Sequence, residues 1–178
     1  MIIRHAEKHT SGRERGVDFD GFHTKHELTV RGWQRAGALV GFFAPPGGLP
    51  AEGAISTPRS ILASAATKAS PSLRAQHTVT ALAELLRIEI DTRHADGEEP
   101  AAAPAALAAP GPVLIAWHHS HIPKLARLIG GDLPNCPALW PDDCFDVVWV
   151  LDRDDDAGPW RFSQVVQRLF ANDRPDPI

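Results

Sequence analysis

The sequence predicts an α/β fold, a three-layer α/β/α sandwich with a mainly parallel sheet, on the basis of three observations. Stretches of strand length alternate with stretches of helical periodicity, as βαβ crossovers require. The run 113–117 is continuously apolar, which is typical of a strand covered on both faces. Proline and glycine separate many of these stretches. Sheets of this kind bind ligands at the carboxyl ends of their strands.

Short apolar or alternating segments mark the strands. They predict strands at 1–6, 54–57, 87–91, 113–117 and 145–151. A turn-like stretch, 153–158, follows the last of these. We expect the segment 160–170 to pair back on that strand as a hairpin arm.

Apolar residues at helical spacing mark the helices, which are predicted at 30–43, 71–86, 101–109 and 122–129. Thr29 is a suitable N-cap for the first helix. Ser70 followed by Pro71 is a favoured start for the second. Pro104 is expected to break the third helix and make it irregular.

The length of 178 residues fits one domain, since domains of ~100–200 residues are common. We therefore expect a single domain over 1–178, with a polar loop at 9–27 and a loose tail at 171–178. A hydrophobic fraction of 43% and a charged fraction of 22% are ordinary for a globular protein that folds in water.

The charge and the apolar pattern exclude several classes of protein. A net charge of −4 argues against a nucleic-acid binder, which would normally carry a basic face. No segment approaches the ~20 apolar residues of a membrane-spanning helix, and the first residues are too charged for a signal peptide. Two cysteines provide neither a disulfide framework nor a metal-binding spacing. A cytoplasmic protein that binds neither nucleic acid nor membrane is expected, with its oligomeric state left open.

Cationic and imidazole side chains lie at the carboxyl ends of two of the predicted strands. Arg4 and His5 are near the end of the first strand, 1–6, and His118 and His119 come directly after 113–117. Because the carboxyl ends of parallel strands meet at one edge of the sheet, we expect these side chains to converge. An arginine beside an imidazole suits a tetrahedral dianion, since the guanidinium donates paired hydrogen bonds and stays charged.

These residue types predict phosphoryl-transfer chemistry without a cofactor or metal. Arg4 and Arg74 are the candidate clamps for the phosphoryl oxygens, with Arg59 as a competing clamp. His5 is the candidate nucleophile, because nearby arginines lower the pKa of an imidazole and keep it neutral. Attack would form a phosphohistidine, and water would then release phosphate, which amounts to phosphomonoester hydrolysis.

The chain resembles the histidine phosphatase superfamily, also called the phosphoglycerate mutase-like family, from residue 1 to about 152. Arg-His-Ala-Glu stands where the family has Arg-His-Gly-Glu, and the other similar segments follow in the family's order: 28–36, 70–78 and 113–119. The resemblance implies a phosphoglycerate mutase-like fold and a metal-independent phosphomonoesterase similar to the histidine acid phosphatases. It also implies a phosphate site built from Arg4, His5, Arg74 and a second histidine.

The resemblance implies a second catalytic histidine and a general acid, and it leaves more than one candidate residue for each. The segment 117–123 is similar to a subgroup that reads Trp-Glu/Gln-His-x-x-Ile-Pro, which favours His119 as the second catalytic histidine, with His118 as the alternative. One branch of the family takes its general acid from the region after the second-arginine helix. That region holds Asp96, Glu98 and Glu99, and Glu98 or Glu99 is the expected acid.

The expected function is therefore hydrolysis of a small phosphorylated substrate through a phosphohistidine on His5. The substrate itself is not predicted, because members of the family act on diverse phosphoesters. A mutase-type phosphotransferase and a non-catalytic phosphoester-binding protein are the alternatives. A metal-binding protein built on the histidines is a third hypothesis, which their spacing does not favour.

Overall fold

The computed structural model describes residues 1–9, 14–48, 50, 53–155 and 158–178. Parts of the expected loop and turn, residues 10–13 and 156–157, lie outside the described residues. The strands are β1 (Ile2–Arg4), β2 (Ser60–Ala63), β3 (Ile90–Asp91), β4 (Val113–Trp117), β5 (Val147–Asp152) and β6 (Arg161–Val166). The helices are α1 (Val30–Phe43), α2 (Arg74–Leu86), α3 (Glu99–Ala108) and α4 (Ile122–Gly130).

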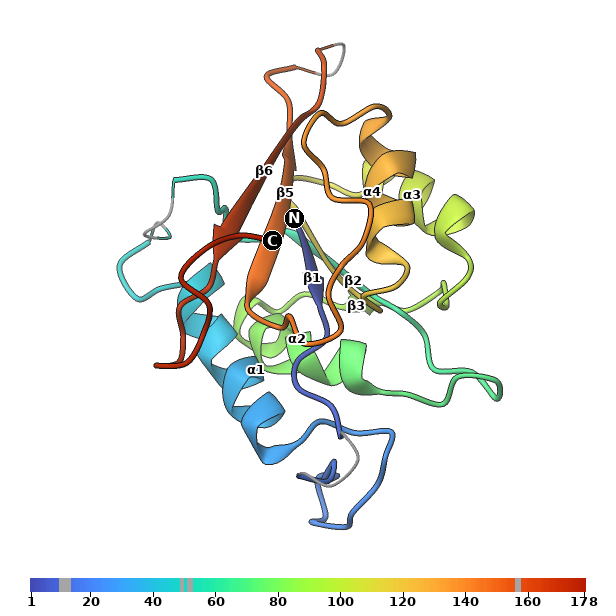
Figure 1. The fold of residues 1–178 in the computed structure, drawn as a ribbon, viewed down its shortest axis with the longest axis vertical. Coiled ribbons are helices and arrows are strands. Elements are labelled where there is room, and N and C mark those ends of the chain that lie inside the picture. The colour runs from blue at the N-terminus through green and yellow to red at the C-terminus, as the bar shows by residue number, and fades with distance from the viewer. Residues whose placement is uncertain (10–13, 49, 51–52, 156–157) are drawn as a thin grey trace.

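The strands form one sheet in the order β3-β2-β4-β1-β5-β6 (Figure 1). The first four strands in this order are mutually parallel. β5 runs antiparallel beside β1, and β6 returns antiparallel beside β5. The predicted mainly parallel sheet and the predicted hairpin arm are therefore both confirmed.

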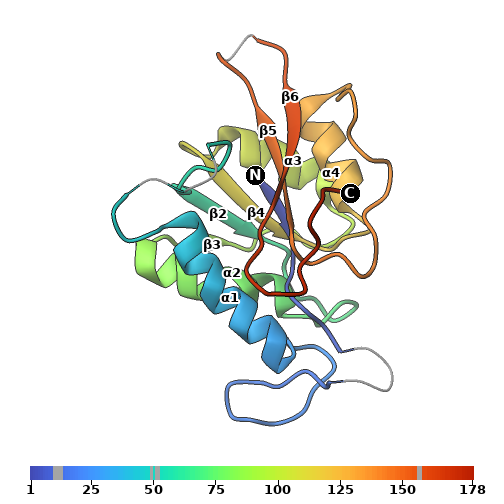
Figure 2. The same cartoon turned by 60° about the vertical axis from the view of Figure 1, so that its left-hand side comes forward.

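Two apolar cores lie on opposite faces of the sheet and make the molecule a three-layer α/β/α sandwich, as predicted. α1 and α2 pack together on one face, where Leu39 and Leu82 are buried. α3 and α4 pack together on the other, where Trp117, Leu125 and Trp149 are buried. Figure 2 shows the two helix pairs on either side of the strands. Among the described residues, no helix has the length and apolar character needed to cross a membrane.

The second strand lies six residues later than predicted. The segment 54–57 joins no ladder, although Ile55 is buried. Pairing starts where Ser60 aligns with Val113, because the amides of Arg59 and Ser60 both donate to the carbonyl of Pro112. An apolar residue such as Ile55 indicates burial. A strand also requires backbone hydrogen bonds to a neighbouring strand in register.

Two helix predictions were wrong in detail. α2 begins at Arg74 and not at Pro71, because the amide of Leu73 is bonded to the carbonyl of His26 in the preceding loop. α3 continues through Pro104 from Glu99 to Ala108, and a second proline at its start fits the first turn. An interior proline there removes one helical hydrogen bond without ending the helix.

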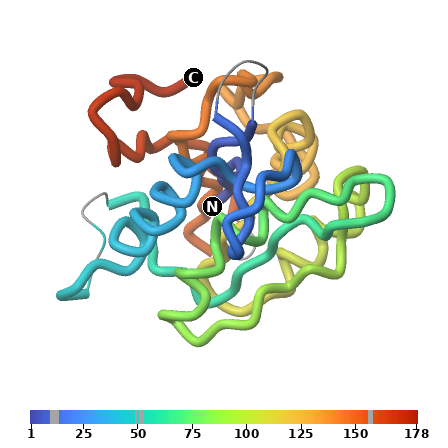
Figure 3. The backbone as a smooth tube through the Cα atoms, turned by 90° about the horizontal axis from the view of Figure 1, so that it is seen from below, coloured from blue at the N-terminus to red at the C-terminus, as the bar shows by residue number. Residues whose placement is uncertain are grey.

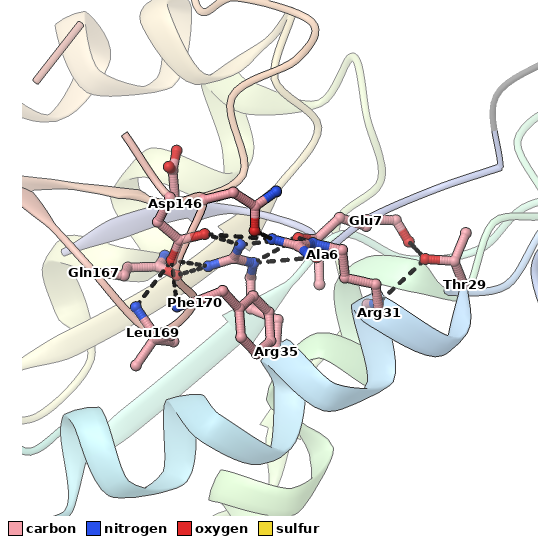
Figure 4. A network of polar contacts seen from close by, with 12 residues as sticks. Ala6, Glu7, Thr29, Arg31, Arg35, Asp146, Gln167, Leu169 and Phe170 are labelled. Atoms are coloured by element: carbon pink, nitrogen blue, oxygen red, sulfur yellow. Dashed lines mark hydrogen bonds and ion pairs between the residues drawn. The ribbon is translucent and has the colours of Figure 1, made fainter. Parts of the chain in front are cut away.

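The predicted loose tail is instead held against the body of the molecule. The side chain of Asp173 is 3% exposed and pairs with Arg35 of α1 at 2.7 Å. The amide of Arg174 donates to Asp146, which precedes β5. Figure 4 shows Arg35 between Glu7 on one side and Gln167, which follows β6, on the other. A polar, proline-containing tail looks loose in sequence because its partners belong to distant elements.

Candidate active site

Three segments meet at the carboxyl edge of the parallel strands. Arg4 aligns with Trp117, so the residues that follow β1 and β4 leave the sheet side by side, and the amide of His5 donates to the carbonyl of Trp117 at 3.1 Å. Because β5 is antiparallel, the segment that precedes it reaches the same edge. Figure 3 views the molecule from below and shows the chain after β1 (blue) lying across this edge.

His5 is buried in the form that a nucleophile requires. Its Nδ1 lies 2.8 Å from the carbonyl of Ala6, so Nδ1–H donates there and Nε2 carries the lone pair. Nε2 is buried and has no hydrogen-bond partner among the described residues. Burial, followed by the charges of Arg4 and Arg74, lowers the pKa of His5 well below its ordinary value of 6.5. The imidazole is therefore neutral at physiological pH, and no described residue engages the lone pair of Nε2.

Arg4 is a buried cation that also holds the segment before β5. Its Nη1 donates to the backbone carbonyls of Pro141, Asp142 and Cys144, at 3.3, 2.5 and 3.2 Å. Its guanidinium lies 3.9 Å over the ring centroid of Phe145, a cation–π contact. Burial lowers the pKa of Arg4 to about 10, so the group stays charged at neutral pH.

Arg74 reaches the site through the first turn of α2. Thr78 ties this turn to the segment after His5: its Oγ1 accepts from the amide of Ala6 at 2.8 Å and donates to the carbonyl of Arg74 at 2.7 Å. The Arg74 Nη1 donates to the carbonyl of Lys25 at 2.8 Å. Thr78 has no predicted role, although its four-residue spacing from Arg74 was an available signal.

The two adjacent histidines face different neighbours. The ring centroid of His118 lies 5.8 Å from that of His5, and its Nδ1 is 2.8 Å from the hydroxyl of Ser120. His119 instead places Nε2 3.3 Å from the carboxylate of Asp142. Burial lowers the pKa of each histidine to about 4, so both are neutral at pH 7. The ring contact places His118, the alternative, beside His5, whereas His119 faces Asp142.

The expected acid Glu99 is committed to a structural role, which corrects that prediction. Its carboxylate is fully buried and accepts from the Trp117 indole at 3.2 Å and from Lys124 at 2.9 Å. Although burial opposes ionisation, hydrogen bonds led by that of Lys124 lower the pKa of Glu99 to about 2. A carboxylate held ionised in this way cannot supply a proton at neutral pH.

Of the other two acids, Asp96 lies closer to the candidate site. Glu98 is exposed and accepts from the amide of Ala95, in a local turn. Asp96 accepts from the backbone amide of His118, and its Oδ1 is buried without a hydrogen-bond partner among the described residues. Burial raises the pKa of Asp96 above its ordinary value, with the nearby Glu99 adding to the effect.

The competing clamp, Arg59, lies at the opposite edge of the sheet. It precedes β2, and its side chain packs against Gly111 before β4.

We therefore expect Arg74→Ala to lower kcat/KM for a phosphate ester by at least about 10²-fold, the effect of losing a donor to transition-state charge. Arg59→Ala should leave kcat/KM within twofold. A crippling Arg59→Ala beside a mild Arg74→Ala would contradict this assignment.

The sheet order and the two helix pairs form the α/β/α sandwich that the sequence predicts, and this fold can be compared with those of known proteins. Among solved structures, "Structure of the protein histidine phosphatase SixA complexed with tungstate" matches this chain with a TM-score of 0.55. The match covers 93% of this chain and 95% of that chain at 16% sequence identity. No family model and no curated protein matches the sequence. The likeness confirms the predicted fold, and the chemistry has to be argued from the residues.

Proposed function

We propose that this protein is a phosphatase that hydrolyses phosphomonoesters through a phosphohistidine on His5. The observation that carries the proposal is the buried, neutral imidazole of His5, whose Nε2 has no hydrogen-bond partner among the described residues and whose pKa is lowered by burial and by the charges of Arg4 and Arg74. The likeness to a histidine phosphatase supports it, because that protein was solved with tungstate, a tetrahedral oxyanion like phosphate. The proposed site uses no metal ion or cofactor.

The proposed reaction has two displacements at phosphorus. His5 Nε2 attacks, the bond between phosphorus and the ester oxygen breaks, and the departing oxygen takes a proton. Water then attacks the phosphohistidine, the phosphorus–nitrogen bond breaks and inorganic phosphate leaves. Arg74, with Arg4, stabilises the charge on the equatorial oxygens in both steps. His118, whose ring lies beside that of His5, donates to one of those oxygens.

Asp96 is the proposed general acid, in place of Glu98 or Glu99. Its raised pKa keeps the carboxyl protonated to a higher pH than a free aspartate, so it can protonate the leaving oxygen and recover the proton from the attacking water. We expect Asp96→Asn to lower kcat by about 10²-fold for an alkyl phosphate and much less for an aryl phosphate, whose leaving group needs no acid.

The pH dependence follows from the same pKa shift. The acid is active when protonated, so alkyl phosphate turnover by the wild-type protein should fall as the pH rises through the Asp96 pKa. The pH profile of Asp96→Asn should lack this fall. Equal losses of Asp96→Asn on alkyl and aryl phosphates would assign the proton to another group.

The second histidine can be identified by comparing His118→Ala with His119→Ala at saturating substrate. The resemblance favours His119, and on that assignment His119→Ala would lose more kcat. The ring contact with His5 leads us to expect the opposite, with His118→Ala losing at least about 10-fold more kcat than His119→Ala. A larger loss in His119→Ala would restore the original assignment.

Turnover of a generic aryl phosphate by the purified wild-type protein tests the function as a whole. We expect hydrolysis at a rate that a chelator does not change, because arginine and histidine side chains supply the charge stabilisation. Tight phosphate binding without turnover of aryl or alkyl phosphates would indicate a non-catalytic phosphoester-binding protein. Activity lost with a chelator and restored by a divalent metal would contradict the metal-independent mechanism.

A further inference from the structure

Three nitrogen atoms from three different segments surround one carboxylate oxygen, Oδ1 of Asp142. The Nζ of Lys8 lies at 2.9 Å, the Nη2 of Arg4 at 3.2 Å and the Nε2 of His119 at 3.3 Å. Arg4 ends β1, Lys8 follows it, and His119 follows β4. Several cationic or N–H donors directed at one oxygen are the arrangement by which proteins hold a phosphate oxygen.

The donors are more buried than the carboxylate that they surround. The side chains of Arg4, His119 and Lys8 are 0%, 15% and 22% exposed, whereas that of Asp142 is 69% exposed. Hydrogen bonding to Lys8 lowers the pKa of Asp142, so the carboxylate is ionised at neutral pH. Asp142 is therefore an exposed anion that covers a preformed group of donors.

Asp142 can leave these donors without disturbing the segment that carries it. The backbone carbonyl of Asp142 is held separately by Arg4 Nη1, and the neighbouring carbonyls of Pro141 and Cys144 bond the same atom. Rotation of the Asp142 side chain into solvent would keep all three backbone contacts. A cavity of about 810 Å³, lined in part by Lys8, Asp142 and Phe145, lies beside the carboxylate.

We propose that Arg4 Nη2, Lys8 and His119 form an anion subsite beside His5, and that Asp142 occupies it until an oxyanion of the substrate displaces it. This inference extends the proposed function, because Arg4 is shared between the subsite and the nucleophile. Asp142 then acts as an internal competitor: it lowers the fraction of the protein that is competent to bind phosphate, and so weakens the apparent affinity. Lys8 becomes a substrate-binding residue outside every motif of the sequence.

Equilibrium binding of inorganic phosphate, measured by calorimetry at fixed ionic strength, tests the proposal. Asp142→Asn keeps the shape of the side chain and removes its charge. We expect it to tighten phosphate binding about five- to tenfold, since the competing ion pairs are partly exposed and individually weak. Asp143→Asn is the matched control, because Asp143 is adjacent and lines the same cavity, and its charge acts on Arg174 rather than on the three donors. It should change the affinity less than twofold.

A second variant separates the subsite from a general effect of charge. Adding Lys8→Gln to Asp142→Asn should reverse the gain in phosphate affinity, because the bound phosphate loses a donor. The proposal is overturned if Asp142→Asn binds phosphate no more tightly than Asp143→Asn, or if Lys8→Gln leaves the gain intact. Thermal unfolding of each variant checks that the fold is retained.

The outcome is distinguishable from that of the phosphatase proposal, because it depends on binding and not on turnover. Tightened phosphate binding in Asp142→Asn, together with a wild-type protein that hydrolyses no ester, would support the subsite and reject the phosphatase. Turnover by the wild type with unchanged phosphate binding in Asp142→Asn would support the phosphatase and reject the subsite.

Discussion

His5→Ala is expected to abolish phosphate ester hydrolysis, with a loss of at least about 10⁴-fold in kcat, as when an enzyme loses its nucleophile. The reason is that the free Nε2 of His5 is the atom proposed to accept the phosphoryl group. The two clamping arginines would still bind phosphate, so the variant should retain measurable affinity for the anion. This variant should therefore bind phosphate without hydrolysing phosphate esters.

The intermediate provides a direct measurement. Rapid quenching of the wild-type protein with a ³²P-labelled substrate should trap a label that is stable in base and labile in acid, and the label should be absent from His5→Ala. His23→Ala, a change at an exposed histidine outside the motifs, is the control and should retain both label and turnover. Substantial activity in His5→Ala would reject the mechanism.

The arrangement of the two principal motifs was predictable because it depends on local patterns and one general rule. A short apolar strand before Arg4 and a continuous apolar run before His118 predict parallel strands, and parallel strands bring their carboxyl ends together. The register of β1 on β4 bears this out. The sequence therefore placed His5 beside the histidine pair without any knowledge of the intervening chain.

The remaining parts of the site depend on contacts that have no local signal. The apolar run of β5 does not indicate that this strand pairs antiparallel with β1. The sequence therefore could not place Asp142 and Phe145, which precede β5, near Arg4. Likewise, Glu99 and Asp96 are both acidic residues in one short segment. Their different roles arise from Lys124 and Trp117, which bind Glu99 from other elements and leave Asp96 without comparable partners.

The ion-pair network around Arg35 connects the segment after β1, α1 and the C-terminal segment (Figure 4). The Arg35 guanidinium donates to Glu7 at 2.9 Å, to Gln167 at 2.9 Å and to Asp173 at 2.7 Å. The exposed fractions of the Arg35, Glu7 and Asp173 side chains are 2%, 12% and 3%. Glu7 lies two residues after His5, so the network also supports the segment that carries His5.

Arg35→Met should therefore lower the free energy of unfolding by about 3–5 kcal/mol, the usual effect of removing one partner from a buried ion pair. The loss arises because methionine fills the space but leaves Glu7 and Asp173 buried without their main counter-charge. Arg31→Met is the matched control, one turn earlier on α1: Arg31 contacts the same two carboxylates, but its side chain is 35% exposed. Its loss should stay below about 1 kcal/mol, as for exposed pairs.

Urea unfolding of the wild type and both variants, at pH 7 and at low pH, measures the loss in free energy of unfolding and tests whether the buried charges cause it. Despite burial, hydrogen bonds from Arg35 lower the pKa of Asp173 below 3.8, so its contribution to stability is present at neutral pH and is lost as the pH falls through that lowered value. The difference in free energy of unfolding between the wild type and Arg35→Met should therefore become smaller at low pH. Equal losses in Arg35→Met and Arg31→Met, or a gap independent of pH, would show that packing rather than the buried charges anchors the C-terminal segment.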